Sequence, residues 1–307
     1  MKNNQVKILL ATYDGDQYIE DQINALLDQT YKNWELLVHD DNSTDHTVKI
    51  IREYSKKYPD KIKFIDDDRS FGSAYENFSF LLNQVRSDYI MFCDQDDIWL
   101  PNKIEVTLKE MKSMEGIYGK GKPLLVHTDL TVIDEYENTL ADSFWQYQHI
   151  DPYRDSVNFL IFQNVVTGCT VMINRKLADL ALPMPKDIIM HDWWMALVAS
   201  VFGKIGIVHG QKVLYRQHST NDTGAKKFDM HYWLERVKIR PTLDKYIRQA
   251  NVFGDRFWEQ LEEKDQKIFR DLKKWETAGF FEKRSMIIRH SLWKHGLIRN
   301  IGLLVFA

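Results

Sequence analysis

The sequence predicts an α/β fold, in which a mostly parallel sheet is flanked by helices and followed by a helical C-terminal region. Over the first 130 residues, short apolar runs alternate with longer amphipathic segments, which is the pattern of βαβ units. The apolar runs contain few polar positions, as strands buried on both faces do. From residue 228 onward the chain is rich in Lys, Glu, Leu and Trp, and we expect helices there.

The first half divides into five strands and four helices. The apolar runs predict strands at 6–11, 35–39, 62–65, 89–93 and 124–127. The segments between them predict helices at 17–27, 44–56, 73–85 and 103–114. The second helix has a clear start, since residues 41–45 offer small oxygen-bearing side chains to its free N–H groups. Ligands of such sheets bind beyond the carboxyl ends of the strands, so the loops after the strands are the candidate site.

The pattern is looser beyond residue 150. Residues 164–174 (NVVTGCTVMIN) predict a strand that is entered through a glycine turn. Residues 204–216 contain two more short apolar runs around His209 and Gly210, and we expect both segments to extend the same sheet. A boundary near 221–227 would separate a first domain, residues 1–225, from a helical region, residues 226–307.

The composition excludes several classes of protein. The chain has 307 residues with 41 Lys and Arg against 44 Asp and Glu, which does not fit a disordered or fibrous protein. Cys93 and Cys169 lie far apart without a CxxC pattern, which argues against a disulfide scaffold or a zinc ribbon. Residues 1–282 carry a net negative charge, which argues against a nucleic-acid-binding protein. The first apolar run is too short for a signal peptide, so we expect a cytoplasmic location.

Carboxylates crowd the loops that follow the first four expected strands. The loops read TYDGD at 12–16, DDNSTD at 40–45, DDDRSFG at 66–72 and DQDD at 94–97. Like charges gathered at one edge of a sheet repel one another unless a cation or a hydrogen-bonding ligand compensates them. The pattern therefore predicts a metal at this edge.

Taken together, these motifs resemble the family 2 glycosyltransferases, and the resemblance covers about residues 5–220. It implies a GT-A fold, with a Rossmann-like, mostly parallel sheet. In that family a Thr-Tyr pair and the second Asp of an Asp-Asp-Asn/Gly-Ser motif hold the nucleotide base, which here implies Thr12, Tyr13 and Asp41. Tyr13 offers a π face, and a carboxylate such as Asp41 can accept the N3–H of uracil or thymine. The alternative for Asp41 is a helix cap.

The segment MFCDQDDIW resembles the family's Asp-x-Asp motif, which holds a divalent cation on the two phosphates of a nucleotide sugar. The resemblance implies Asp94 and Asp96 as ligands of Mg²⁺ or Mn²⁺, both of which prefer carboxylate oxygens. Asp97 is either an extra partner or a cap of the next helix. The later segment YRQH implies His218 as a further metal ligand and Arg216 as a partner of the diphosphate.

The segment MHDWW lies where the family carries its catalytic carboxylate at the start of a helix. This implies that Asp192 is the base that takes the proton from the acceptor hydroxyl in an inverting transfer. Trp193 and Trp194 would then form an apolar wall that stacks on the acceptor sugar and helps to raise the pKa of Asp192. The alternative is a capping Asp followed by two core tryptophans.

Residues 69–82 (RSFGSAYENFSFLL) are most similar to bacterial rhamnosyltransferases that build cell-wall and capsular polysaccharides from dTDP-L-rhamnose. This similarity adds Arg69 to the donor contacts and implies a growing, lipid-linked glycan as acceptor. Residues 1–130 would bind the nucleotide sugar, and residues 131–225 the acceptor. A UDP-hexose donor is the alternative within enzymes. A catalytically silent subunit that binds sugar nucleotides or glycans is the alternative outside them.

The last 25 residues form a basic and apolar segment. Residues 283–307 contain five Lys or Arg and no acid, with apolar residues at near-helical spacing. Such a segment can lie on an anionic membrane surface, which would place the enzyme at the inner face of the cell membrane. The alternative is a helix that packs on the catalytic domain or on a second subunit of a homodimer. We further expect the polar run at 219–224 to close over the donor as a lid.

Overall fold

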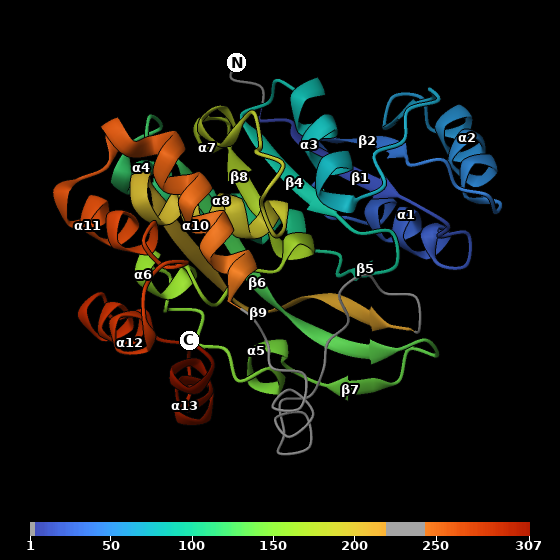
Figure 1. Cartoon of the computed structure of the whole chain (residues 1–307). Coiled ribbons are helices and arrows are strands. Elements are labelled where there is room, and N and C mark those ends of the chain that lie inside the picture. Colours follow the sequence, from blue (N-terminus) through green and yellow to red (C-terminus); the bar gives the residue numbers. More distant parts are fainter. Residues whose placement is uncertain (1–3, 219–242) are drawn as a thin grey trace.

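The computed structural model describes residues 4–218 and 243–307, which form one mixed sheet with helices on both faces (Figure 1). The strand order is β3-β2-β1-β4-β8-β6-β9-β5, and β7 pairs with β6 beside this path. The strands are β1 (Val6–Thr12), β2 (Trp34–Asp40), β3 (Ile62–Ile65), β4 (Tyr89–Cys93), β5 (Ile98–Trp99), β6 (Leu124–Asp134), β7 (Thr139–Ala141), β8 (Met172–Asn174) and β9 (Lys204–Gln217). The predicted α/β class is confirmed.

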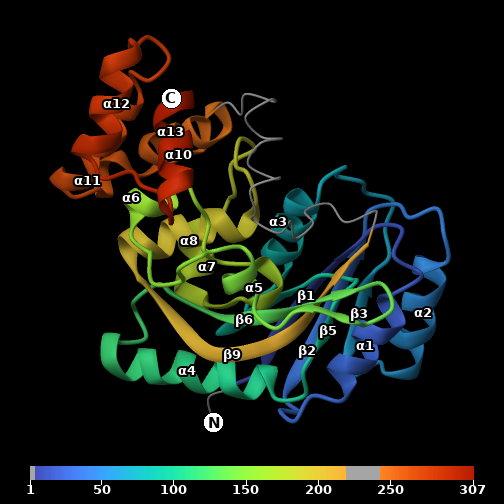
Figure 2. The same ribbon diagram turned by 90° about the horizontal axis from the view of Figure 1, so that it is seen from below.

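The helices lie in two layers, one on each face of the sheet (Figure 2). One layer holds α1 (Ile19–Leu27), α2 (Thr47–Lys57) and α4 (Lys103–Tyr118). The other layer holds α3 (Ala74–Gln84), α6 (Val157–Leu160), α7 (Arg175–Ala181), α8 (His191–Phe202) and α10 (Asp244–Phe257). The remaining helices are α5 (Phe144–Tyr147), α11 (Glu263–Leu272), α12 (Phe280–Arg289) and α13 (Leu297–Phe306).

The core follows the pleat of the strands. In β1, Val6, Ile8 and Leu10 are buried against the layer of α1 and α4, whereas Leu9 is buried against the layer of α3. Successive side chains of a strand point to opposite faces, so a strand covered on both sides must be apolar throughout. Strand 89–93, which is buried at every position, was predicted with its observed bounds for this reason, and the edge strand 62–65 was also predicted with its observed bounds.

The first four strands run parallel, so their carboxyl ends meet at one edge of the sheet. Beyond β4, the short strand β8 is antiparallel to both of its neighbours. Here the sequence prediction was too long, since 164–174 forms a strand only at Met172–Asn174 and a 3₁₀ turn at Gly168–Thr170. The two runs at 204–216 form one strand, β9, whose pairing with β6 shifts register where Gly210 takes φ +87°.

The C-terminal helices share the core of the sheet. Trp194 of α8 packs on Phe253 and Phe257 of α10, with ring centroids 5.5 and 6.0 Å apart. The core cluster of this layer runs from Leu9 in β1 to Leu303 in α13. The expected boundary near residue 225 lies outside the described residues, so the division into two domains stays a prediction. Within 4–218 and 243–307, no helix has the length and hydrophobicity that a membrane span requires.

Candidate active site

The loops after β1 and β2 are joined by hydrogen bonds at the carboxyl edge of the sheet. The Asp14 carboxylate accepts from the backbone N–H of Thr44 at 2.7 Å, and the Asp14 N–H donates to the Ser43 hydroxyl at 2.8 Å. Thr12 is buried, and its hydroxyl donates to Asp40 at 2.7 Å. Several carboxylates of these loops therefore accept hydrogen bonds from backbone N–H groups, which compensates part of their negative charge.

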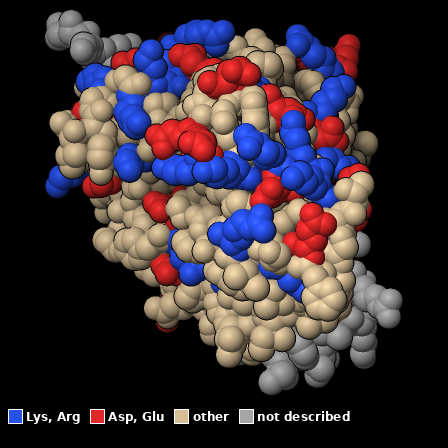
Figure 3. All heavy atoms as spheres, turned by 60° about the vertical axis from the view of Figure 1, so that its left-hand side comes forward, with Lys and Arg blue, Asp and Glu red and all other residues tan. Residues whose placement is uncertain are grey.

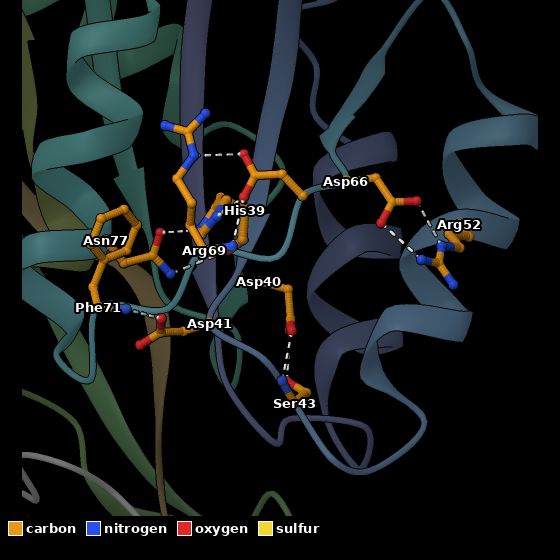
Figure 4. A network of polar contacts seen from close by, with 10 residues as sticks. His39, Asp40, Asp41, Ser43, Arg52, Asp66, Arg69, Phe71 and Asn77 are labelled. Atoms are coloured by element: carbon orange, nitrogen blue, oxygen red, sulfur yellow. Dashed lines mark hydrogen bonds and ion pairs between the residues drawn. The ribbon is translucent and has the colours of Figure 1, made fainter.

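Asp41 joins the loops after β2 and β3 (Figure 4). Its buried carboxylate accepts from the backbone N–H of Phe71 at 2.5 Å and of Gly72 at 2.8 Å. The helix-cap alternative for Asp41 is wrong, because α2 begins at Thr47, whose N–H donates to Asp45 at 2.9 Å. Its expected role in holding the nucleotide base stays a prediction.

We expect Asp41→Asn to destabilise this edge. An amide has one acceptor oxygen where the carboxylate has two, so one of the two backbone N–H groups loses its partner at a cost of about 1–3 kcal/mol. Thermal unfolding and a dTDP titration of the variant measure the two consequences, a lower melting temperature and weaker nucleotide binding. Asp68→Asn is the matched control, since Asp68 is exposed in the same loop. An unchanged melting temperature for Asp41→Asn would contradict this role.

Tyr13 presents its ring to solvent beside Asp41's loop. The side chain is 57% exposed, while its peptide is clamped by the Gln95 amide, which accepts from the Tyr13 N–H at 2.9 Å and donates to the Tyr13 carbonyl at 2.8 Å. A Cβ at Gly15 would lie 2.4 Å from the Gln95 side chain, so the clamp requires glycine there. Sequence reasoning missed Gln95, although its place between Asp94 and Asp96 was a signal.

Arg69 lies on the loop after β3, which Asp41 holds (Figure 4). Its guanidinium pairs with Asp67 at 3.1 Å and lies 4.6 Å from the Phe80 ring centroid. The backbone N–H of Arg69 also donates to Asp67 at 3.0 Å and lowers the pKa of that carboxyl. Asp67 contacts the buried His39 ring at 3.3 Å, so this loop is fixed to β2. Arg69 therefore lies at the edge of the expected donor site.

Asp96 and His218 meet at the other side of the site. The His218 Nε2 atom lies 2.9 Å from an Asp96 carboxylate oxygen, and the Tyr18 ring lies 4.8 Å from the His218 ring. The structure thus brings together two residues that lie 122 positions apart in the sequence, and their role as metal ligands stays a prediction. A carboxylate with an imidazole beside it is a donor set that suits Mn²⁺, and the carboxylate suits Mg²⁺.

Asp94, Asp97 and Cys169 form a second group beneath this pair, with ligand atoms within 4.8 Å of one another. Asp97 is fully buried and accepts from the Arg216 backbone N–H at 3.3 Å, so it does not cap α4. Burial raises the pKa of Asp97 and of the Cys169 thiol well above their usual ranges. A protonated thiol does not suit Mg²⁺ or Mn²⁺, and Asp94 with Asp96 fits these ions better.

Arg216 braces the Asp94–Asp97 loop. Its buried guanidinium donates to the Asp96 carbonyl at 3.1 Å and lies 3.4 Å from both Asp21 and Glu137. It also lies 4.8 Å from the Tyr18 ring centroid. The expected contact of Arg216 with the diphosphate stays a prediction.

Asp192 lies in the first turn of α8 and is buried among its neighbours. Its carboxylate accepts from the Trp193 backbone N–H at 2.7 Å and from the Asn164 amide at 3.2 Å. Burial raises the pKa of Asp192 to about 6, and these two hydrogen bonds oppose the rise. Asn164 was missed from the sequence, where residues 164–174 were assigned to a strand.

A single short segment brings Asp192 and the acidic loop together. Asn164 bonds Asp192, and a Cβ at Gly168 would lie 3.7 Å from the Asp192 Cβ. The next residue, Cys169, lies beside Asp94. A carboxylate with a raised pKa and an acidic loop thus flank the same turn. Such a carboxylate can take a proton from a reacting hydroxyl group.

Trp193 and Trp194 do not form a wall for a sugar. Both are buried, and their ring N–H groups donate to the carbonyls of Leu160 at 2.6 Å and Ala181 at 3.0 Å. The start of α8 is buried on all sides between the sheet and α10, so the alternative of two core tryptophans is correct. The MHDWW motif therefore does not identify the residues that bind the acceptor.

Residues 7–178, more than half of the sequence, match the family model described as Glycosyl transferase family 2. The chain belongs to glycosyl transferase family 2. The resemblance drawn from the motifs is therefore confirmed, and the protein is a glycosyltransferase with a GT-A-like fold. The run at 219–224, expected to act as a lid, lies outside the described residues.

Relatives of this family 2 glycosyltransferase act on different donors. It is 27% identical over 227 residues to the dTDP-rhamnosyl transferase RfbG of Shigella flexneri, covering 70% of this chain and 74% of that one. It is 30% identical over 180 residues to the Escherichia coli UDP-Glc:alpha-D-GlcNAc-diphosphoundecaprenol beta-1,3-glucosyltransferase WfgD, covering 58% and 64%. The mannosyltransferase PcManGT of Pyrobaculum calidifontis, solved with GDP-Man and Mn²⁺, shares the fold with a TM-score of 0.52 at 14% identity, covering 98% and 78%.

Proposed function

We propose that this chain transfers a sugar, with inversion, from a nucleotide-diphosphate donor to a glycan hydroxyl. One observation carries the proposal: Asp192 and the Asp94–Asp97 loop flank the turn at Gly168–Thr170. In an inverting transfer, the base and the leaving diphosphate lie on opposite sides of the anomeric carbon. The arrangement of these two carboxylate groups suits that geometry.

Asp192 takes the proton from the attacking hydroxyl. A pKa of about 6 leaves this carboxylate ionised at neutral pH and more basic than an ordinary aspartate. The Asn164 amide and the Trp193 N–H hold its orientation. Asp94 and Asp96, with His218 beside them, would hold Mg²⁺ or Mn²⁺, which stabilises the charge of the leaving diphosphate when bound. The Mn²⁺ in the mannosyltransferase of the same fold supports this assignment.

The nucleoside end of the donor is assigned to the edge formed by Thr12, Tyr13, Asp41 and Arg69. The exposed Tyr13 ring offers a stacking face, and Asp41 lies in the neighbouring loop. The favoured donor is dTDP-L-rhamnose, which the motif at 69–82 and the named activity of the Shigella relative support. A UDP-hexose is the second candidate, since thymine and uracil offer Asp41 the same N3–H and the Escherichia coli relative uses UDP-Glc.

The acceptor we propose is a lipid-linked bacterial surface glycan. The name of the Escherichia coli relative gives a lipid-linked sugar as the acceptor of that protein. An acceptor anchored in a bilayer and a donor made in the cytoplasm meet at the inner face of the cell membrane. We therefore place the enzyme there. The family signature of long-chain synthases, Gln-x-x-Arg-Trp, is absent because Arg216 is followed by Gln217, which favours the addition of one or a few sugars.

Calorimetry with dTDP and with UDP, each with and without Mn²⁺, tests the proposed donor site. We expect dTDP to bind more tightly than UDP and only with the metal. Tyr13→Ala should weaken dTDP binding by about 1–3 kcal/mol through loss of stacking, whereas Tyr13→Phe should not. Tighter binding of UDP would favour the hexose donor. Binding of neither nucleotide would contradict the proposal, and binding without any transfer would favour a silent subunit.

A further inference from the structure

Helix α13 turns an apolar face to solvent. Leu297, Ile301 and Val305 are spaced four residues apart, so they lie on one side of the helix, and they are 75%, 48% and 61% exposed. Within this helix no Asp, Glu, Lys or Arg is among the exposed residues. The only buried residue of the helix is Leu303, on the opposite side. An exposed helix face of this kind marks an interaction surface.

Helix α12 extends the same surface. Phe280 and Phe281, at its start, are 61% and 85% exposed. The Arg284 guanidinium of α12 donates to the Ala307 carbonyl at 2.8 Å and to the Val305 carbonyl at 3.2 Å, and it lies 3.2 Å from the Phe280 ring centroid. These contacts hold the start of α12 beside the end of α13, so the two apolar stretches adjoin.

The orientation of α13 is fixed by its one arginine. The Arg299 guanidinium donates to the backbone carbonyls of Gln148 and His149, which draws the charged side of the helix toward the body of the protein. The apolar side is thereby left facing outward. Figure 3 shows that the lower part of this side of the molecule is mostly free of charged groups, below a band of Lys and Arg.

The positive charge of this C-terminal segment favours an anionic lipid surface over a second copy of the chain. Residues 280–307 carry five basic residues, of which Arg289 pairs with Asp271 at 3.1 Å, and one acid, Glu282. A symmetric dimer would bring this patch against its own copy and set like charges together. An anionic lipid surface attracts the same charges and accepts exposed Leu, Ile, Val and Phe side chains.

We propose that the apolar face of α12 and α13, formed by Phe280, Phe281, Leu297, Ile301 and Val305, docks on an anionic lipid bilayer. Figure 1 shows α13 at the same end of the molecule as α5 and β7. The hairpin between β6 and β7 carries Glu137, which contacts Arg216 beneath the candidate metal loop. Docking by this face would hold that end of the protein at the lipid surface.

Flotation of the full chain with vesicles tests this surface without any nucleotide, so its result is independent of the proposed transfer. We expect binding to vesicles that contain phosphatidylglycerol, little binding to pure phosphatidylcholine, and a decrease with salt. The triple variant L297S/I301S/V305S should bind at least about tenfold less. Ile117→Ser is the matched control, because Ile117 is 70% exposed on α4, away from this surface.

Two results would overturn the proposal. One is flotation of the triple variant equal to that of the unsubstituted protein. The other is a lack of flotation together with a dimer, seen by light scattering, that the triple variant abolishes, since the face would then bind a second copy. Circular dichroism of each variant confirms that the exposed substitutions leave the fold intact.

Discussion

Asp192→Asn should lose sugar transfer and keep donor binding. The amide accepts no proton from the attacking hydroxyl, and removal of a general base costs about 10²- to 10⁴-fold in rate. The substitution keeps the size of the side chain and an oxygen that accepts from the Trp193 N–H. The release of nucleoside diphosphate in the presence of acceptor measures the rate, and calorimetry with dTDP and Mn²⁺ measures the binding.

The pH dependence of the unsubstituted enzyme checks the same role. Asp192 accepts a proton only when it is ionised, and burial raises its pKa to about 6. The transfer rate should therefore fall about tenfold for each pH unit below 6 and be level above it. Asp187→Asn is the matched control for Asp192→Asn and should keep full activity, since Asp187 is exposed just before α8. Full activity of Asp192→Asn, or a level profile down to pH 5, would remove Asp192 from the mechanism.

Asp96→Asn should abolish the metal dependence of donor binding. The neutral amide is a poorer ligand for Mg²⁺ or Mn²⁺ than a carboxylate, and His218 loses the oxygen that lies 2.9 Å from its Nε2 atom. We expect the affinity for dTDP with Mn²⁺ to fall by at least about 100-fold and to approach the affinity without metal. Calorimetry at matched Mn²⁺ concentrations measures the change.

Glu137→Gln provides the comparison for Asp96→Asn. Glu137 is half exposed and contacts the same Arg216, but it lies on the hairpin and outside the acidic loop. This variant should bind dTDP and Mn²⁺ as the unsubstituted protein does. If instead Asp96→Asn kept metal-dependent binding and Glu137→Gln lost it, the metal site would have to be moved to the hairpin.

The sequence predicted most of the first half of the fold, although it missed the short strand β5 and ended the strand that begins at residue 124 too early. Strands 62–65 and 89–93 were predicted with their observed bounds, and the second is buried at every position because it is covered on both faces. The second half was harder. Residues 164–170 are as apolar as a strand, yet they form the turn that joins Asp192 to the acidic loop. An apolar segment predicts burial, but it does not distinguish a strand from a buried turn.

Among the predicted site residues, the structure brings the carboxylate and the imidazole together and buries the aromatic and guanidinium side chains. Asp96 and His218 were paired through motifs, and the structure brings them within hydrogen-bonding distance. Trp193, Trp194 and Arg216 were assigned to ligands, and the structure buries all three. An aromatic or guanidinium side chain suits a ligand and a protein interior equally well, and only the packing of neighbouring elements decides between them.

We propose that one site binds the nucleobase and the phosphates of the donor together with the acceptor glycan. Anomalous diffraction from crystals grown with dTDP and Mn²⁺ tests it most directly. We expect a manganese peak about 2.0–2.3 Å from a carboxylate oxygen of Asp96 or Asp94, with the thymine ring stacked on the Tyr13 ring. A manganese peak elsewhere, or dTDP bound away from these loops, would contradict it.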